Sequence, residues 1–238
     1  MTDVSPSGHT LRPIALFAEL SDYELENVAR HCTFSDHSAG QQIVHHLDSS
    51  HDVYFVLSGS VRAVVYSASG KEVSYRDIGD GEIFGEFAAI DGKARSATVV
   101  ALLDCAIASI TAELFWKLLE RYPKLAAALL KHLTRLVRLY SERIREFATL
   151  PVGVRVRIEL LRLARASERS GRAAVIYPAL THAELASRIG THREAVTREI
   201  SALRRQGVVR TEGKQLVVPD LDGLEKIVYR ALGESLTQ

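Results

Sequence analysis

Apolar positions along the chain change their spacing twice, and these changes divide the sequence into regions. Between about residues 33 and 110, short runs rich in β-branched and aromatic residues alternate with turns that contain Gly. The runs cover residues 42–46, 53–57, 60–66, 72–78 and 98–110. Short strands at this spacing are typical of an all-β roll or barrel. We therefore expect a closed roll whose wall can enclose a pocket.

From about residue 111 to residue 149 the apolar positions take a helical period. They step alternately by four and three along a heptad row that one Arg interrupts, namely Tyr122, Ala126, Leu129, Leu133, Leu136, Tyr140, Arg143 and Phe147. Such a row predicts a parallel dimer along a helix of residues 124–149. The alternative is a helix packed on its own roll through Leu118, Leu119, Leu125 and Ile144. Pro123 predicts a break or a new helix near the start of this region.

The helical pattern is interrupted at Pro151 and Gly153. Pro is tolerated in the first turn of a helix but not in its interior, so we predict a domain boundary and a hinge at residues 149–153. An amphipathic helix is predicted over residues 154–167. A small hairpin over residues 208–218 and a closing helix over 224–232 complete the C-terminal region.

Two pairs of capping residues mark the starts of two short helices after residue 180. Thr181 with Glu184, and Thr191 with Glu194, have the spacing of a capping box, and Gly190 lies between the two helices. Two short helices joined by a Gly turn form a helix-turn-helix. An ordinary helical hairpin with a charged exposed face is the alternative. At the other end of the chain, Ser21 and Glu24 form a similar pair and predict a helix start.

The second of these helices begins with side chains suited to reading DNA. They are His192, Arg193, Glu194, Thr197 and Arg198. Residues at the start of a recognition helix reach base edges. Arg can donate two hydrogen bonds to guanine, and Glu can accept one from cytosine. This face therefore indicates sequence-specific contact with double-stranded DNA.

One further stretch, FGEFAAIDGKARSATVV at residues 84–100, carries candidate ligand chemistry. Gly85 allows backbone to approach a ligand, and Arg95 presents a planar fork of donors that suits a phosphate. The small residues Ser96 and Ala97 leave their N–H groups free to reach the same oxygens. Glu86 can accept a hydrogen bond from a ribose hydroxyl. The stretch suits a small sugar phosphate, and a surface turn in which Glu86 and Arg95 pair is the alternative.

Charge is distributed unevenly over a chain whose net charge is only +1. Residues 1–149 carry 15 Lys and Arg against 19 Asp and Glu, whereas residues 150–238 carry 15 against 10. A basic second half indicates a polyanionic partner. Length allows two modest domains, and no apolar run is long enough to span a membrane. The polar start MTDVSPSGHT lacks the features of a signal peptide, so we expect a cytoplasmic protein.

Metal chemistry receives less support from the sequence. Cys32 and Cys105 are too few for a disulfide framework or a four-thiolate cluster. His45, His46 and His51 raise the possibility of a metal-dependent β-barrel enzyme, which remains the alternative of a different class. His45 and His46 are adjacent, so on a strand they point to opposite faces, and no His-x-His pair occurs. We therefore expect no metal and no enzymatic activity.

The stretch 84–100 resembles the phosphate-binding cassette of cyclic-nucleotide-binding domains. With the long helix and the winged helix-turn-helix that follow, residues 15–230 resemble the bacterial cAMP receptor protein/FNR family of transcription regulators, and its cAMP receptor protein branch in particular. The resemblance implies that Glu86 binds the ribose 2′-hydroxyl and that Arg95, Ser96 and Ala97 bind the cyclic phosphate, with Gly85 allowing close approach. Phe87 is included in the same site. The resemblance also implies cAMP or cGMP as the allosteric effector.

The family also implies which residues meet the nucleotide base and the DNA. Its long helix offers a Thr-Ser pair to the adenine, and Tyr140 and Ser141 stand at that place here. Tyr140 can contact a purine or pack in the dimer seam. Arg193, Glu194 and Arg198 would read an operator half-site of TGTGA type. Thr181, Thr191 and His192 would hold phosphates.

These observations predict an α+β protein with an N-terminal cyclic-nucleotide-binding β-roll, a long dimerisation helix and a C-terminal winged helix-turn-helix. The predicted segments are a flexible arm over residues 1–14, the roll over 15–112, the dimerisation helix over 113–149 and the DNA-binding domain over 150–238. We expect a homodimer on a palindromic DNA operator, with RNA polymerase as a further partner. The same architecture sensing another effector, or none, is the alternative.

Overall fold

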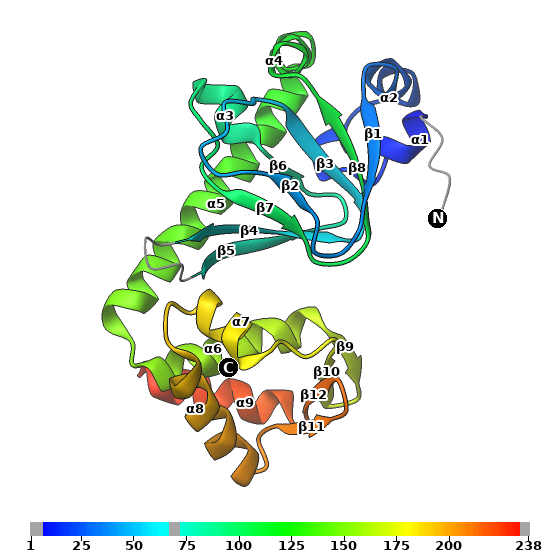
Figure 1. The fold of residues 1–238 in the computed structure, drawn as a ribbon. Coiled ribbons are helices and arrows are strands. Elements are labelled where there is room, and N and C mark those ends of the chain that lie inside the picture. Colours follow the sequence, from blue (N-terminus) through cyan, green and yellow to red (C-terminus); the bar gives the residue numbers. More distant parts are fainter. Residues whose placement is uncertain (1–6, 67–71, 234–238) are drawn as a thin grey trace. The chain divides into compact units, whose positions relative to one another are not determined.

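The computed structural model describes residues 7–66 and 72–233 (Figure 1). The chain divides into two compact units, Met1–Arg138 and Leu139–Gln238. The division falls inside one long helix, α5 (Pro123–Thr149), and not at the break that follows it. The end of α5, from Leu139 onwards, therefore belongs to the second unit.

The N-terminal unit begins with short helices that are packed into its core. They are α1 (Gly8–Leu11), η1 (Ala15–Phe17) and α2 (Asp22–Ala29). Leu11 and Ile14 are fully buried, so the prediction of a loose arm is wrong for the described part of residues 1–14. The predicted arm also includes residues 1–6, which lie outside the described residues. The capping box of Ser21 and Glu24 is confirmed at the start of α2.

The expected roll is formed by two four-stranded antiparallel sheets within the described N-terminal residues. One sheet has the order β1-β8-β3-β6 and the other β2-β7-β4-β5. The strands are β1 (Thr33–His37), β2 (Gln42–Val44), β3 (Val53–Ser58), β4 (Ser60–Tyr66), β5 (Glu72–Gly79), β6 (Ile83–Phe84), β7 (Thr98–Ala101) and β8 (Cys105–Ile110). A cluster that includes Val44, Val61 and Ile107 draws on both sheets, so their inner faces share one core.

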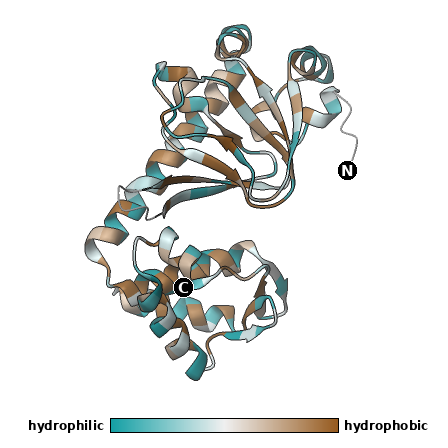
Figure 2. Cartoon of the chain, in the orientation of Figure 1, coloured by the Kyte–Doolittle hydropathy of each residue, from teal (hydrophilic) through white to brown (hydrophobic). Residues whose placement is uncertain are grey.

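Three helices complete this unit: α3 (Glu86–Asp91), α4 (Ala112–Arg121) and α5. A new helix does begin at Pro123, as predicted. Figure 2 shows apolar and polar residues alternating along α5. Leu118, Leu119 and Leu125 are buried in the core, as expected for a helix packed on its own roll, but Ile144 is 68% exposed.

The heptad row on α5 requires a correction. Tyr122, Leu129 and Leu136 are buried within the chain itself. By contrast, Leu130 and Val137 are 66% and 64% exposed, although both are large and apolar. An apolar row that is half-buried to exposed, here called the α5 stripe, again steps by four and three: Ala126, Leu130, Leu133, Val137, Tyr140, Ile144 and Phe147. It shares four residues with the predicted row, and Leu130, Val137 and Ile144 replace the predicted Leu129, Leu136 and Arg143.

The C-terminal unit is a winged helix-turn-helix. It contains α6 (Val152–Ala166), α7 (His182–Arg188), α8 (Arg193–Arg205) and α9 (Leu221–Leu232) around one core. A four-stranded antiparallel sheet of order β11-β12-β10-β9 adjoins them. Its strands are β9 (Glu168–Ser170), β10 (Ala173–Ile176), β11 (Arg210–Glu212) and β12 (Gln215–Val218). The predicted wing is confirmed as β11 and β12, and β9 and β10 form a further hairpin of the same sheet.

One predicted cap in this unit is wrong. The capping box of Thr181 and Glu184 forms at the start of α7. The cap residue of α8 is His192, not Thr191, and it makes no side-chain capping bond. Thr191 is instead buried, and its N–H donates to the carbonyl of Ala186 at 3.0 Å. The turn that ends α7 therefore draws Thr191 inward, and the helix starts later than its sequence motif suggests.

Among the described residues, no helix combines the length and the apolar character needed to cross a membrane.

Candidate ligand site and nucleic-acid interface

Gly85 forms the corner between β6 and α3. Its φ of +83° lies in the left-handed region, which favours Gly. A Cβ atom at this position would lie 2.7 Å from the Asp52 carbonyl oxygen and 2.8 Å from Nη1 of Arg95. The absence of a side chain thus lets the Arg95 guanidinium lie directly against this corner.

Arg95 is 2% exposed, and its guanidinium is held by neutral acceptors. Nε donates to the Ser50 hydroxyl at 3.0 Å, Nη1 to the Gly85 carbonyl at 3.1 Å and Nη2 to the Asp52 carbonyl at 2.9 Å. These bonds use three of the five N–H donors of the guanidinium. No carboxylate lies within ion-pair distance of Arg95 among the described residues. The alternative in which Glu86 and Arg95 pair with each other is therefore not what the structure shows.

Arg62 in the same roll shows how a buried Arg is otherwise accommodated. It is 5% exposed, and its Nε and Nη2 donate to the carboxylate of Asp77 at 2.6 and 3.1 Å. A buried charge is costly unless it is paired. Arg62 meets this requirement within the chain, whereas the positive charge of Arg95 remains available to an anion.

Several residues that the sequence did not identify support Arg95. Ser50 and Asp52 precede β3, and the Tyr54 ring lies under the guanidinium at 5.5 Å. Tyr54 in turn stacks on Phe84 with ring centroids 4.8 Å apart. Burial raises the pKa of Tyr54, so its hydroxyl stays protonated. In the sequence, only the aromatic residues of the predicted strands could have indicated that Tyr54 and Phe84 support Arg95.

Glu86 begins α3 and is 4% exposed. Its Oε1 lies 3.5 Å from Nε2 of His132 on α5. Glu86 directly follows Gly85, whose carbonyl accepts from Arg95, so the three residues lie at one corner of the roll, and their role in ligand binding stays a prediction. Ser96 is exposed and Ala97 half-buried, while Phe87 is 39% exposed. Tyr140 and Ser141 lie on α5 in the second unit, and their part in a ligand site stays a prediction.

The residues predicted to read DNA lie at the start of α8, with His192 as its cap residue, and their contact with DNA stays a prediction. The side chains of His192, Arg193, Glu194, Thr197 and Arg198 are all exposed. Val196, Ile200 and Leu203 on the opposite face are buried, which fixes the orientation of the helix. Thr191, expected to hold a phosphate, is 7% exposed and contributes mainly to the turn.

His182 is a further polar residue beside this face. Its Nδ1 lies 2.8 Å from the Thr197 hydroxyl, so α7 and α8 are linked at their exposed edge. Partial burial, with Arg204 and Arg193 nearby, lowers the pKa of His182. Arg204 also donates to the Thr211 hydroxyl at 2.8 Å and so connects α8 with the wing. These contacts were not predictable from the helix pattern alone.

Metal-binding clusters are not found in the described part of the chain: no three His, Cys, Asp or Glu side chains lie together in a suitable arrangement. His45, His46 and His51 accordingly form no such group. Cys32 and Cys105 are free, and burial raises the pKa of the Cys32 thiol to about 12.

A roll, a long helix and a winged helix-turn-helix form the architecture whose two parts match known protein families. Residues 36–122 match the cyclic nucleotide-binding domain, and residues 154–227 match the Crp-like helix-turn-helix domain. The chain belongs to the cAMP receptor protein/FNR (CRP/FNR) family of transcription regulators. It is thus a regulator and not an enzyme.

Three known proteins illustrate this similarity. The cAMP-activated global transcriptional regulator CRP of Salmonella typhimurium is 27% identical over 199 residues, which cover 83% of this chain and 95% of that protein. A CRP/FNR-family transcriptional regulator from Thermus thermophilus is 27% identical, with a TM-score of 0.70 over 84% of this chain and 100% of that one. The catabolite activator protein of the same organism is 30% identical, with a TM-score of 0.51 over 91% and 99%.

Proposed function

We propose that this protein is a homodimer that binds a cyclic nucleotide, with cAMP preferred over cGMP, and in that state binds a palindromic DNA operator. The observation that carries the proposal is the buried guanidinium of Arg95, which has three neutral hydrogen-bond acceptors and no carboxylate partner among the described residues. A cyclic phosphate carries one negative charge and oxygens for the remaining N–H donors.

The other residues of the proposed effector site follow from this assignment. Glu86 accepts a hydrogen bond from the ribose 2′-hydroxyl, Gly85 allows close approach, and Ser96 and Ala97 add donors for the phosphate. Phe87 lies next to Glu86 in the same turn. Tyr140 and Ser141 are proposed to contact the base. The preference for cAMP is supported by relatives described as cAMP-activated.

Dimer formation is proposed to occur along the α5 stripe. Leu130, Val137 and Ile144 are each more than 60% exposed, at intervals of seven residues. Exposed large apolar residues in a heptad row are the usual contact surface of a two-stranded coiled coil. A second copy of the same helix covers this row in the proposed dimer, which brings two α8 recognition helices to one operator.

On DNA, Arg193, Glu194 and Arg198 are proposed to contact base edges, with Thr197 beside them. Thr181 and His192 are proposed to contact phosphates, whereas Thr191 is buried and its N–H already donates to the Ala186 carbonyl, so this role is not proposed for it. The operator half-site proposed from the family is of TGTGA type. RNA polymerase is the proposed further partner, and these partners imply a cytoplasmic protein. No metal is proposed.

The test is calorimetric titration of the full-length protein with cAMP and with cGMP, repeated in the presence of operator DNA. We expect cAMP to bind more tightly than cGMP and to strengthen operator binding, since an effector must bind the active state more tightly. Replacing Arg95 by Ala should abolish nucleotide binding, whereas Arg62→Met, which removes an equally buried but paired Arg, should lower stability and leave binding in the folded protein.

Two results would contradict the proposal. Unchanged nucleotide affinity in Arg95→Ala would show that Arg95 does not hold the phosphate. Operator binding that neither cAMP nor cGMP alters would favour the alternative, in which the same architecture senses another effector or none.

A further inference from the structure

His132 brings the long helix into contact with the proposed ribose-binding carboxylate. The imidazole Nε2 lies 3.5 Å from Oε1 of Glu86, and the two residues are 9% and 4% exposed. His132 is far from the cassette in the sequence and belongs to no motif. Its position next to Glu86 is therefore a result of how α5 packs on the roll.

The distance between these two atoms is longer than a normal hydrogen bond. Nε2 of His132 is buried and has no hydrogen-bond partner among the described residues. A carboxylate only accepts hydrogen bonds, an imidazole N–H donates, and a hydroxyl does both. A hydroxyl beside this pair can therefore donate to Glu86 and accept from His132 at the same time.

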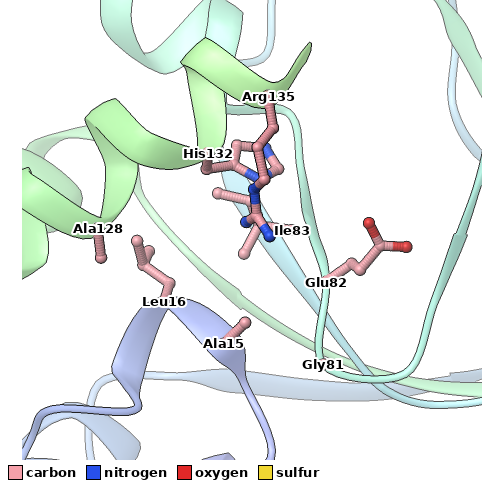
Figure 3. Close-up of a pocket in the computed structure, with 8 residues that line it drawn as sticks. All are labelled: Ala15, Leu16, Gly81, Glu82, Ile83, Ala128, His132 and Arg135. Atoms are coloured by element: carbon pink, nitrogen blue, oxygen red, sulfur yellow. The ribbon is translucent and has the colours of Figure 1, made fainter. Parts of the chain in front are cut away.

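The imidazole of His132 also adjoins empty space. His132 lines a cavity of about 90 Å³ together with Leu16, Ile83, Ala128 and Arg135. Figure 3 shows His132 and Arg135 extending from α5 towards Ile83, with Leu16 approaching from η1. Protein interiors are otherwise closely packed, so the imidazole has a neighbouring space into which it can adjust when a ligand hydroxyl binds.

From these observations we propose that His132 is a second ribose-binding residue, which donates a hydrogen bond to the same hydroxyl that Glu86 accepts from. The proposal rests on the proposed function, because it assigns a further residue to that effector site. It also gives α5 a direct contact with the sugar. The helix that carries the α5 stripe would then sense the nucleotide through His132 as well as through any contact with the base.

The experiment compares each cyclic nucleotide with its 2′-deoxy form. Dissociation constants for cAMP, 2′-deoxy-cAMP, cGMP and 2′-deoxy-cGMP are measured by calorimetry on the full-length protein. The ratio of the two constants for one base isolates the contribution of the hydroxyl. We expect His132→Leu to reduce this ratio about tenfold, the effect of losing one hydrogen bond to a ligand hydroxyl. His132→Gln, whose amide N–H can replace Nε2–H, should retain most of the ratio.

Two controls separate a binding role from a structural one. Arg135→Leu changes the same cavity one turn along α5 without a contact to Glu86, and it should leave the ratio unchanged. In a Glu86→Leu background, which removes the acceptor, His132→Leu should reduce the ratio far less than in the wild type, because the two residues act on one hydroxyl. Thermal unfolding without ligand confirms that each variant is folded.

The outcomes distinguish the two proposals. Two outcomes, in a wild type that binds a nucleotide, would show that His132 is not a ribose ligand and that the effector site stands without it. In the first, His132→Leu keeps the full ratio. In the second, His132→Gln, His132→Leu and Arg135→Leu all lower the ratio to the same extent. If the wild type binds none of the four nucleotides, the proposed function fails and the role of His132 fails with it.

Discussion

Arg188 on α7 donates a hydrogen bond to Glu159 on α6 at 3.1 Å, and both residues are at least nine-tenths buried. Arg162 lies next to Glu159 and also pairs with Glu146 near the end of α5, its Nη1 donating to Oε2 at 3.1 Å. Three successive helices of the C-terminal unit are therefore joined by buried or half-buried charges. The first helix of the helix-turn-helix is held to the end of α5 through α6.

Breaking the Glu159–Arg188 pair should destabilise the C-terminal unit strongly. In Glu159→Gln both Arg188 and Arg162 lose a buried carboxylate partner, so we expect a loss of about 1–3 kcal/mol in the free energy of unfolding. Denaturation followed by circular dichroism measures it. Arg172→Ala is the matched control, because the Arg172–Asp220 pair is exposed and should contribute about 0–1 kcal/mol. Similar losses in the two variants would contradict this assignment.

Gly85 and Gly92 both have positive φ, so comparing them separates the effect of crowding at Gly85 from the effect of backbone strain. Gly85→Ala introduces a Cβ 2.8 Å from Nη1 of Arg95, whereas Gly92, with φ +66°, has no atom within 4 Å of such a Cβ. Both substitutions should cost about 1 kcal/mol of stability for the backbone conformation. Only Gly85→Ala should also weaken nucleotide binding, measured by calorimetry. Equal affinities in the two variants would show that the corner is not part of the site.

Whether the α5 stripe is the dimer contact can be tested by placing one charged side chain in it. Val137→Glu places a carboxylate in the exposed apolar row, and since Val137 is 64% exposed the monomer should tolerate it. We expect the dimer to dissociate at concentrations where the wild type is fully dimeric, because a buried unpaired charge at the interface is costly. Analytical ultracentrifugation measures the association. Lys131→Glu, also exposed and on another face of α5, should leave it intact.

The start and the end of α8 should contribute differently to DNA binding. Arg193→Ala should cost about 1–3 kcal/mol on the preferred operator and relax the preference at one base pair. Arg205→Ala, at the exposed C-terminal end of the helix, should weaken binding equally on all sequences or not at all. Competition binding with operator variants measures both. If Arg193→Ala also weakened all sequences equally, Arg193 would be a phosphate contact.

Much of the fold could be predicted from the residue pattern. The strand over residues 60–66 coincides with β4, and the helix start at Pro123 and the cap at Thr181 are confirmed. These features depend on local periodicity and on backbone chemistry. Half of the predicted heptad row was replaced by its neighbours, because spacing alone does not show whether Leu129 or Leu130 faces the chain's own core. The run over residues 98–110 was predicted as one strand but divides into β7 and β8, with Asp104 between them.

In the candidate site, too, local sequence features could be predicted and contacts made by tertiary packing could not. Glu86 and Arg95 were predicted because they lie in one continuous stretch. Ser50, Asp52 and His132 were not, since each is brought to the site by tertiary packing from a distant part of the chain. No local rule places an α5 imidazole 3.5 Å from a carboxylate at the start of α3.

The placement of Glu146 and Phe147 affects where this protein can be cut into separately folding pieces. Phe147 lies under the Arg155 guanidinium at 5.4 Å, and Arg155 in turn donates to the Ile189 carbonyl at 2.7 Å. A fragment that starts at residue 150, after the end of α5, would remove the ring beneath Arg155 and the carboxylate that pairs with Arg162. A fragment that starts at Leu139 retains both. The end of the long helix thus acts as the first structural element of the DNA-binding domain, although it precedes the sequence boundary of that domain.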